Sequence, residues 1–251
     1  MYQTINGLTI RSVDYKEADK ILTVLTEDRG RLTVKARGVR RKGSRLKASA
    51  QLFAFSRMTL YENNGRCSLQ EAEVLQPFTG LQRDIAAFSL ASYLAEVLAT
   101  EAEDAPVDNE VQRLALNCLY ALSNDLAPAP IVKAAFELRY MAMAGYAPEL
   151  HACAVCGKEL PESPTVALEA GGLHCKSCAI PGFSGRQFSL TPAALSAARY
   201  LLACDLKKLF SFQLPEEDLR RLGIFTEAYL LSCMERSFRT LDFYKTVGET
   251  T

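Results

Sequence analysis

The chain has 251 residues, about half of them apolar, which is enough for one large hydrophobic core or two ordinary ones. Acidic and basic residues number 29 each, and an evenly spread net charge of zero would argue against a nucleic-acid partner. No stretch approaches the roughly eighteen apolar residues of a membrane helix, and the N-terminus carries no secretory signal. We therefore expect a cytoplasmic protein, not bound to a membrane, whose thiols stay reduced.

The first part of the chain is predicted to form five short strands. Alternating, β-branched segments at residues 8–13, 21–26, 31–37, 51–61 and 67–75 are typical of strands, and turn sequences occupy residues 27–30 and 62–65. The Asn-Gly pair in the second turn suits a tight hairpin. Five strands in so few residues predict a small closed barrel of OB type, although an SH3-like barrel would give a similar pattern. Pro77 ends this region.

Helical periodicity replaces the alternation after Pro77. Apolar spacings of three and four predict helices at residues 81–98, 110–122 and 131–144, with breaks at Ala105-Pro106 and at Pro128, and a cap at Gly145. Residues 148–188 lose this periodicity and contain Pro, Gly and Cys. Thr191-Pro192 restarts a helix, residues 215–241 are predicted to form a last one, and residues 246–251 a frayed tail.

These elements predict an α+β protein in three parts. Residues 1–78 form an OB-fold DNA-binding domain, and residues 79–147 with 189–245 form a helical domain. Residues 148–188 form a four-cysteine zinc module inserted in the helical domain.

A basic segment follows the second predicted strand. Between residues 29 and 47 there are nine cations and no acidic residue: Arg29, Arg31, Lys35, Arg37, Arg40, Arg41, Lys42, Arg45 and Lys47. Arg31, Lys35 and Arg37 have the same parity and are expected on one face of a strand. A one-signed cluster in a neutral protein favours sequence-independent contact with nucleic-acid phosphates over a merely solvated surface. Phe53, Phe55 and Tyr61 are candidates for base stacking, with a role in the barrel core as the alternative.

Four cysteines are arranged as two pairs. Cys153 and Cys156, then Cys175 and Cys178, form two C-x2-C knuckles, whose spacing lets four thiolates surround one ion. We predict a single structural Zn2+, because four thiolates leave no open coordination position. His151 or His174 in place of one sulfur is an open alternative. A redox dithiol is disfavoured because no βαβ pattern surrounds the motif. The other four cysteines lie in apolar segments and are expected to pack as small hydrophobic residues.

Sequence motifs of enzymes are missing. There is no phosphate-binding Gly-rich loop, both histidines adjoin the cysteine knuckles, and no Asp-x-Asp motif occurs. We therefore expect no catalytic residues.

Several segments in a fixed order resemble RecO, a family of bacterial recombination mediators. They are YKEADKI at 15–21, TEDRG at 26–30, ARGVRR at 36–41 with Ser44-Arg45, GYAPEL at 145–150 and GGL at 171–173. The resemblance spans nearly the whole chain and implies an OB-fold, a helical domain and a zinc module.

The resemblance also implies a function and partners. RecO-like proteins bind single- and double-stranded DNA and anneal complementary strands. With RecR they help RecA load onto strands coated by single-strand-binding protein (SSB). The basic segment from Arg37 to Lys47 would hold phosphates, and the four paired cysteines would hold zinc. The family docks the acidic, hydrophobic C-terminal tail of SSB on its helical domain, where Arg113, Lys133 or Arg139 are candidates here.

Two other functions compete with this interpretation. An OB-fold reads either polymer, so an RNA-binding barrel with a zinc ribbon is the main alternative. A nuclease or other hydrolase would need clustered acidic residues for divalent metal ions, which the sequence does not contain.

Overall fold

The computed structural model describes residues 1–100, 109–161, 163–169, 172–178 and 184–248. The predicted break at Ala105-Pro106 and the glycine at position 171 lie outside these residues. The described chain forms two compact units: residues 1–124 with 238–251, and residues 125–237. The three-part division expected from the sequence follows secondary structure and stays a prediction.

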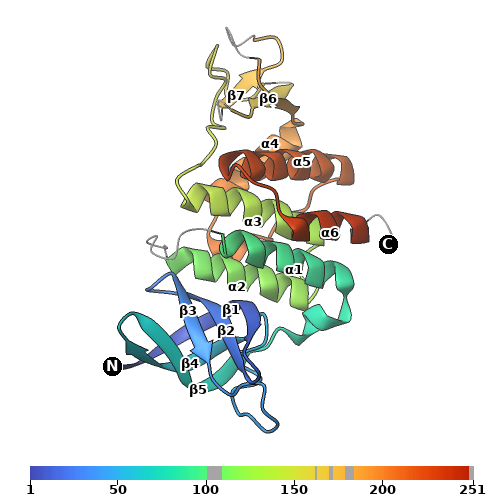
Figure 1. The fold of residues 1–251 in the computed structure, drawn as a ribbon. Helices are drawn as coiled ribbons and strands as arrows, with labels where there is room; N and C mark the ends of the chain where they lie inside the picture. Colours follow the sequence, from blue (N-terminus) through green and yellow to red (C-terminus); the bar gives the residue numbers. More distant parts are fainter. Residues whose placement is uncertain (101–108, 162, 170–171, 179–183, 249–251) are drawn as a thin grey trace. The chain divides into compact units, whose positions relative to one another are not determined.

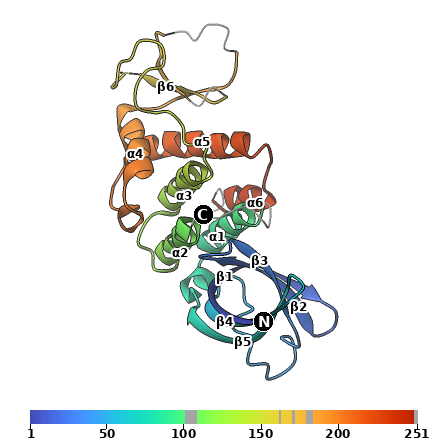
Figure 2. The same cartoon turned by 90° about the vertical axis from the view of Figure 1, so that its left-hand side faces the viewer.

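Five strands form a closed barrel in the first unit. They are β1 (Tyr2–Tyr15), β2 (Asp19–Thr26), β3 (Arg31–Ala36), β4 (Phe55–Asn63) and β5 (Arg66–Gln76). Their order around the barrel is β1-β2-β3-β5-β4, with β3 and β5 parallel and the other pairs antiparallel. Figure 2 shows the five strands as a ring. This arrangement confirms the predicted α+β class with an N-terminal OB-like barrel.

Strand β1 closes the barrel by pairing with two partners. Its first half pairs with β4 and its second half with β2, and Gly7 is opposite both Thr26 and Ser56. A Cβ atom at Gly7 would lie 2.3 Å from Val24 Cγ1, so only glycine allows this close approach. The turn after β4 contains Asn64 and Gly65 at positive φ, as the Asn-Gly pair predicted.

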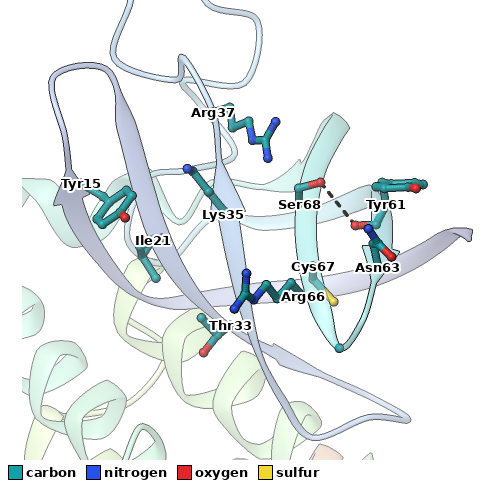
Figure 3. Close-up of a pocket in the computed structure, with 11 residues that line it drawn as sticks. Tyr15, Ile21, Thr33, Lys35, Arg37, Tyr61, Asn63, Arg66, Cys67 and Ser68 are labelled. Atoms are coloured by element: carbon teal, nitrogen blue, oxygen red, sulfur yellow. Dashed lines mark hydrogen bonds between the residues drawn. The ribbon is translucent and has the colours of Figure 1, made fainter.

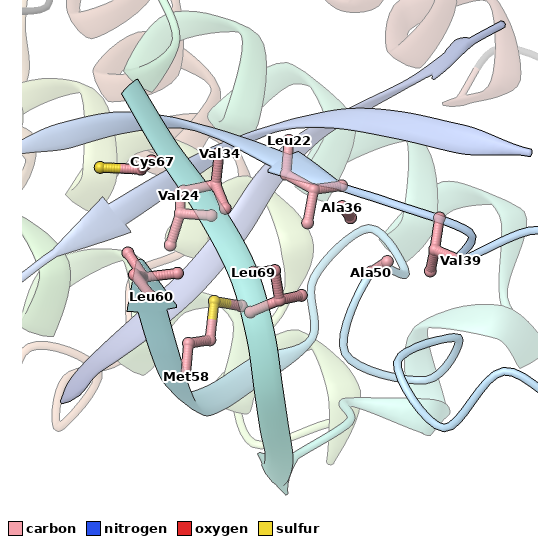
Figure 4. Close-up of a cluster of buried hydrophobic side chains, with 10 residues drawn as sticks. All are labelled: Leu22, Val24, Val34, Ala36, Val39, Ala50, Met58, Leu60, Cys67 and Leu69. Atoms are coloured by element: carbon pink, nitrogen blue, oxygen red, sulfur yellow. The ribbon is translucent and has the colours of Figure 1, made fainter. Parts of the chain in front are cut away.

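Alternate residues of the strands fill the barrel. The cluster in Figure 4 comprises Leu22, Val24, Val34, Ala36, Val39, Ala50, Met58, Leu60, Cys67 and Leu69. Because side chains alternate across a strand, the residues between them face outward. Val39 and Ala50 come from the long β3–β4 connection, so this connection is anchored on the barrel core at both of its ends.

Four helical segments complete the first unit: η1 (Thr79–Arg83), α1 (Ile85–Leu98), α2 (Asn109–Ser123) and α6 (Arg239–Gly248). Figure 1 shows α6 beside α1. Tyr93 of α1 meets Phe238 with ring centroids 5.7 Å apart, and the Thr240 amide donates to the Glu96 carboxylate. The predicted helix at 81–98 is in fact η1 followed by α1, because Asp84 caps the amide of Ala86 and starts a new helix.

The second unit contains α3 (Ala129–Met143), α4 (Pro192–Ala203), η2 (Leu206–Lys208) and α5 (Glu216–Cys233). Thr191 caps α4 through the Ala194 amide, and Gly145 has a positive φ after α3, as predicted. The three strands β6 (Pro164–Ala167), β7 (Gly172–Cys175) and β8 (Gln187–Ser189) form a small sheet in the order β7-β6-β8, which the sequence did not indicate.

The predicted last helix at 215–241 is wrong in its extent. Helix α5 ends at Cys233, Glu235 adopts a positive φ of 50°, and a separate helix begins at Arg239. Helix α6 continues to Gly248, so the predicted frayed tail is helical at least that far. Within the described residues, no helix combines the length and the apolar character needed to cross a membrane.

Candidate nucleic-acid interface and metal centre

A groove of about 700 Å³ lies on the outer face of the barrel. Its walls come from the end of β1, from β2 and β3, and from the β4–β5 hairpin, and they include Tyr15, Lys35, Arg37, Tyr61 and Arg66 (Figure 3). The β2–β3 face with the β1–β2 and β4–β5 loops is the surface on which OB-folds bind oligonucleotides. The groove therefore lies where this fold usually binds its ligand.

Strand parity explains which side chains reach the groove. In β3, Val34 and Ala36 are buried in the barrel core, so Thr33 and Lys35 face outward. In β4, Leu60 is buried and its neighbour Tyr61 faces the groove.

Acidic residues hold part of the basic surface in place. Lys35 Nζ lies 3.2 Å from a carboxylate oxygen of Asp19, whose other oxygen accepts the amide of Gly38 at 2.8 Å. The Gly38 amide, together with the nearby Lys35 ammonium, lowers the pKa of Asp19 below its usual value, although burial acts in the opposite direction. Arg40 pairs with Asp14 at 3.2 Å, and Arg29 pairs with Glu62 at 2.9 Å. The contacts of Gly38 with Asp19 and of Arg40 with Asp14 join the start of the β3–β4 connection to the residues on either side of the β1–β2 turn, whereas the Arg29–Glu62 pair joins the β2–β3 turn to β4.

Five of the predicted cations are exposed and have no acidic partner in the part of the chain that the structure describes. They are Arg37, Arg41, Lys42, Arg45 and Lys47, and all belong to the β3–β4 connection. We call residues 37–47 the basic loop. Because these charges are not neutralised internally, they are available to an external anion.

Two sequence candidates lie elsewhere. Arg31 is only 3% exposed, and its Nη1 donates to the carbonyl oxygen of Leu98 at 2.7 Å, so it joins the barrel to α1 and does not face solvent. Phe53 is buried and meets Phe88 edge-on at 5.6 Å. Both belong to the packing of the first unit and are left out of the proposed interface, whereas Phe55 is half-buried at the start of β4.

Tyr15 and Arg66 are among the groove residues that sequence reasoning missed. Tyr15 ends β1, and Lys35 Nζ lies 5.0 Å from the centre of its ring. Arg66 opens β5 directly after the Asn64-Gly65 turn. The β1–β2 and β4–β5 hairpins could have indicated both residues, because residues beside these hairpin loops border the binding face of an OB-fold.

Four cysteine sulfurs gather in the second unit. Ligand atoms of Cys153, Cys156, Cys175 and Cys178 all lie within 4.8 Å of one another, and the Cys156 and Cys175 sulfurs are 3.6 Å apart. Sulfurs placed tetrahedrally about 2.3 Å from a zinc ion would be about 3.8 Å apart, whereas a disulfide needs about 2 Å. The predicted cluster of thiols is thus present, and its geometry suits a metal ion.

Backbone turns bring the two cysteine pairs together. In the first knuckle the Cys153 amide donates to the Lys158 carbonyl and the Gly157 amide to the Cys153 carbonyl, with Gly157 at a φ of 74°. The Cys175 amide donates to Cys153 Sγ at 3.3 Å, which links the knuckles. Burial raises the pKa of Cys153, but amides of Cys156, Cys175 and Val155 outweigh it and lower the pKa to about 6. A thiolate, the form that binds metal, is therefore favoured there.

Neither histidine joins the cluster of ligand atoms found in the described residues. His151 is exposed and faces Glu159 at 3.7 Å. His174 is buried, and its Nδ1–H donates to the Cys175 carbonyl at 3.0 Å. The geometry therefore favours four sulfur ligands over three sulfurs and a nitrogen.

Arg199 of α4 connects the first knuckle to the helices. Its Nε donates to the Leu150 carbonyl at 2.8 Å, and its Nη2 donates to the carbonyls of His151 and Glu159 at 2.6 Å each. These acceptors flank the knuckle on both sides. The planar guanidinium, with several donors in one fork, therefore fixes both ends of the knuckle on α4.

The three candidates for docking an acidic tail differ in exposure. Lys133 is 7% exposed and lies 2.8 Å from a Glu137 oxygen and 2.9 Å from a Glu227 oxygen. Arg139 donates to the carbonyls of Leu201 and Leu202. Arg113 is exposed. Lys133 is thus committed to the core of the second unit and does not face a partner.

Comparisons with known proteins cover nearly the whole chain. Family models described as "Recombination protein O N terminal" and "Recombination protein O C terminal" match residues 1–78 and 82–242. A protein named "DNA repair protein RecO" from Heliobacterium modesticaldum is 32% identical over 97% of this chain and 89% of its own length. One with the same name from Acetivibrio thermocellus is 28% identical over 98% and 97% of the two chains. The chain therefore belongs to the RecO family of DNA repair and recombination proteins.

Proposed function

We propose that this protein is a DNA-binding recombination mediator without catalytic turnover. It binds single- and double-stranded DNA, anneals complementary strands, and with RecR helps RecA load onto SSB-coated single strands, in the cytoplasm at the nucleoid. The observation that carries the proposal is the groove on the ligand-binding face of the barrel, whose lining includes Arg37, the first of the five unneutralised cations of the basic loop. Membership of the RecO family supports the repair role.

The basic loop supplies phosphate contacts. Each phosphate that a lysine or arginine neutralises releases condensed counterions, so binding is strong at low salt and largely independent of sequence. Two complementary strands repel each other through their phosphates. A loop that neutralises part of this charge lowers the repulsion and favours annealing without an energy source.

The four-cysteine cluster is proposed to hold one structural zinc ion. Cys153, Cys156, Cys175 and Cys178 would supply four thiolates, leaving no coordination position for a reacting group. Zinc would stabilise a segment whose short strands form too small a core to fold alone.

Protein partners are part of the proposal. The acidic tail of SSB would need an exposed cation, and of the three candidates Arg113 keeps that property.

Annealing of complementary SSB-coated oligonucleotides, without ATP, tests the mediator function. A variant with Arg41→Glu, Lys42→Glu and Arg45→Glu should anneal at least about tenfold more slowly, and its binding should depend less steeply on salt because about three phosphate contacts are lost. The matched control is Lys207→Glu, Lys208→Glu and Arg236→Glu, which changes the same charge at exposed positions of the second unit.

Equal annealing by the loop variant and the control variant would refute the role of the basic loop. No annealing by the zinc-loaded wild type at low salt would refute the mediator function. A parallel titration with RNA of equal length separates DNA from RNA binding, since a preference for RNA would favour the alternative of an RNA-binding barrel.

A further inference from the structure

We propose that the groove and the basic loop recognise different features of nucleic acid. The groove takes unpaired bases, which stack on Tyr15 and Tyr61, and so selects single strands. The basic loop contacts phosphates and accepts single strands and duplexes alike. This inference rests on the proposed function, because it specifies the ligand of the same site.

Tyr61 is an exposed aromatic residue in a charged surface. It is 37% exposed, and the ring of its cross-strand partner Tyr2, itself 67% exposed, lies 5.1 Å away at 53°. Single exposed apolar side chains are common, but adjacent ones that form a patch are typical of binding surfaces, and Tyr61 and Tyr2 form such a pair. Tyr61 lines the groove together with Arg66 (Figure 3). The groove lining thus includes both an aromatic side chain that could stack on a base and a cation that could bind a phosphate.

Tyr15, on the β1–β2 hairpin, likewise combines an exposed aromatic ring with nearby cations. Its side chain is 41% exposed, and the ammonium groups of Lys35 and Lys16 lie 5.0 and 5.6 Å from its ring centre. Both ammonium groups lie over the ring in cation–π contacts, so a base that stacks on Tyr15 would replace one of them, and the displaced ammonium would bind the phosphate of that nucleotide. Tyr15 and Tyr61 come from the β1–β2 and β4–β5 hairpins, which border the binding face of an OB-fold.

Stacking on these rings requires bases that have left a duplex. In a duplex each base is covered on both faces by its neighbours, so an aromatic side chain on a groove wall finds no free base face. Single strands expose these faces, and a stacked base adds affinity for them alone.

The basic loop has no exposed aromatic residue that could distinguish single strands from duplexes. Phe53 is the only aromatic residue between Arg37 and Ala54, and it is buried against Phe88. Contacts from the loop are therefore restricted to charge and hydrogen bonds with the backbone, which both kinds of nucleic acid possess.

A tryptophan reporter tests stacking directly, because the chain contains no tryptophan. In a Tyr61→Trp variant the indole fluorescence should be quenched by oligo(dT). A duplex of equal length and an abasic oligomer with the same phosphates should bind through the loop and leave it unchanged. The control variant is Tyr120→Trp, an exposed position of α2 outside the groove, where none of the three ligands should quench.

A second variant measures selectivity. Tyr15→Leu with Tyr61→Leu should lower affinity for oligo(dT) about tenfold or more, leave duplex affinity unchanged, and so lower the single-to-double-strand ratio. Leucine keeps apolar bulk at outward positions, and a thermal melt checks that the variant is folded.

The outcomes distinguish the two proposals. A wild type that binds neither oligo(dT) nor duplex refutes the proposed function. If the wild type binds both ligands, this inference is refuted when oligo(dT) leaves the Trp fluorescence of the Tyr61→Trp variant unchanged. It is also refuted if the double leucine variant loses single-strand and duplex affinity equally.

Discussion

Burial decides which of the charged residues in this chain act inside the protein and which face outward. Arg31 and Lys133 are nearly inaccessible and bind internal acceptors, whereas Arg113 and the five unpaired cations of the basic loop are exposed. The spacing of charged residues in the sequence could not predict this difference in burial, because it does not show which neighbours cover a side chain.

A substitution of Lys133 tests how much a buried charge contributes to stability. Lys133→Met would leave the Glu137 carboxylate, which is fully buried, without its cation, although Thr226 still donates to it. Removing one partner of a buried ion pair costs about 3–5 kcal/mol, so urea unfolding should show a loss of this size. The matched exposed change, Arg113→Met, should stay within about 0.5 kcal/mol of wild type. A small effect of Lys133→Met would contradict the buried network.

The pH dependence of this effect follows from the pKa of Lys133. Burial lowers it, but the carboxylates of Glu137 and Glu227 raise it by more, and the net shift is upward. A group whose pKa is raised by folding contributes stability below its unfolded pKa and loses it as pH rises through the folded value. The stability difference between wild type and Lys133→Met should therefore be constant at neutral pH and shrink only in strong alkali.

The cysteine cluster was the most predictable part of the candidate site. Two C-x2-C pairs predicted a gathering of four sulfurs, and the structure confirms the gathering because such short knuckles restrict where their thiols can point. The groove was less predictable. Tyr15 and Arg66 are distant in sequence from the basic loop, and only barrel closure brings them beside Lys35.

Secondary structure elements were predicted best where local signals mark their ends. The Asn64-Gly65 turn and the Thr191 cap have such signals and were confirmed. The five barrel strands are present, but β1 begins at Tyr2 and β4 at Phe55, and not at residues 8 and 51 as predicted. The break between α5 and α6 has neither glycine nor proline, and Glu235 adopts its left-handed conformation there. Since glutamate carries no preference for that conformation, the break arises from the separate packing of α6 against α1 and not from its own sequence.

Gly80 tests the packing of η1 on the end of α2. A Cβ atom there would lie 1.8 Å from the backbone oxygen of Ser123, which cannot move aside as a flexible side chain would. Gly80→Ala should therefore destabilise the protein by about 1–3 kcal/mol in denaturant unfolding. Gly223→Ala in α5 is the control, since no atom lies within 4 Å of its added Cβ, and it should stabilise by up to about 1 kcal/mol. Equal effects of the two changes would contradict the close contact.

For the whole molecule, a barrel followed by helices was predictable from the change of period at Pro77, but the composition of the two units was not. Helix α6 belongs with the barrel, α1 and α2, while α3, α4 and α5 belong with the cysteine module. Contacts between Thr240 and Glu96 join residues 144 positions apart, and no local pattern encodes such a pairing.

Removal of the metal should affect one unit selectively. A strong chelator should abolish hydrogen-exchange protection around the knuckles, at residues 150–158 and 172–178, because the proposed zinc stabilises this segment. The amides of β1 to β5 should keep their protection in the same sample, since the barrel holds no part of the cysteine cluster. Unchanged protection at the knuckles after verified zinc loss would contradict a structural role for the ion.

The split of the first unit between both ends of the sequence has a consequence for biosynthesis. The ribosome completes α2 about 115 residues before it begins α6, which at ~5–20 residues per second is a delay of roughly 5–25 s. During this interval the face of α1 around Tyr93 has no Phe238 to cover it, whereas the second unit is continuous and emerges in one piece. The newly made barrel unit is therefore open to chaperones and proteases until its final helix arrives.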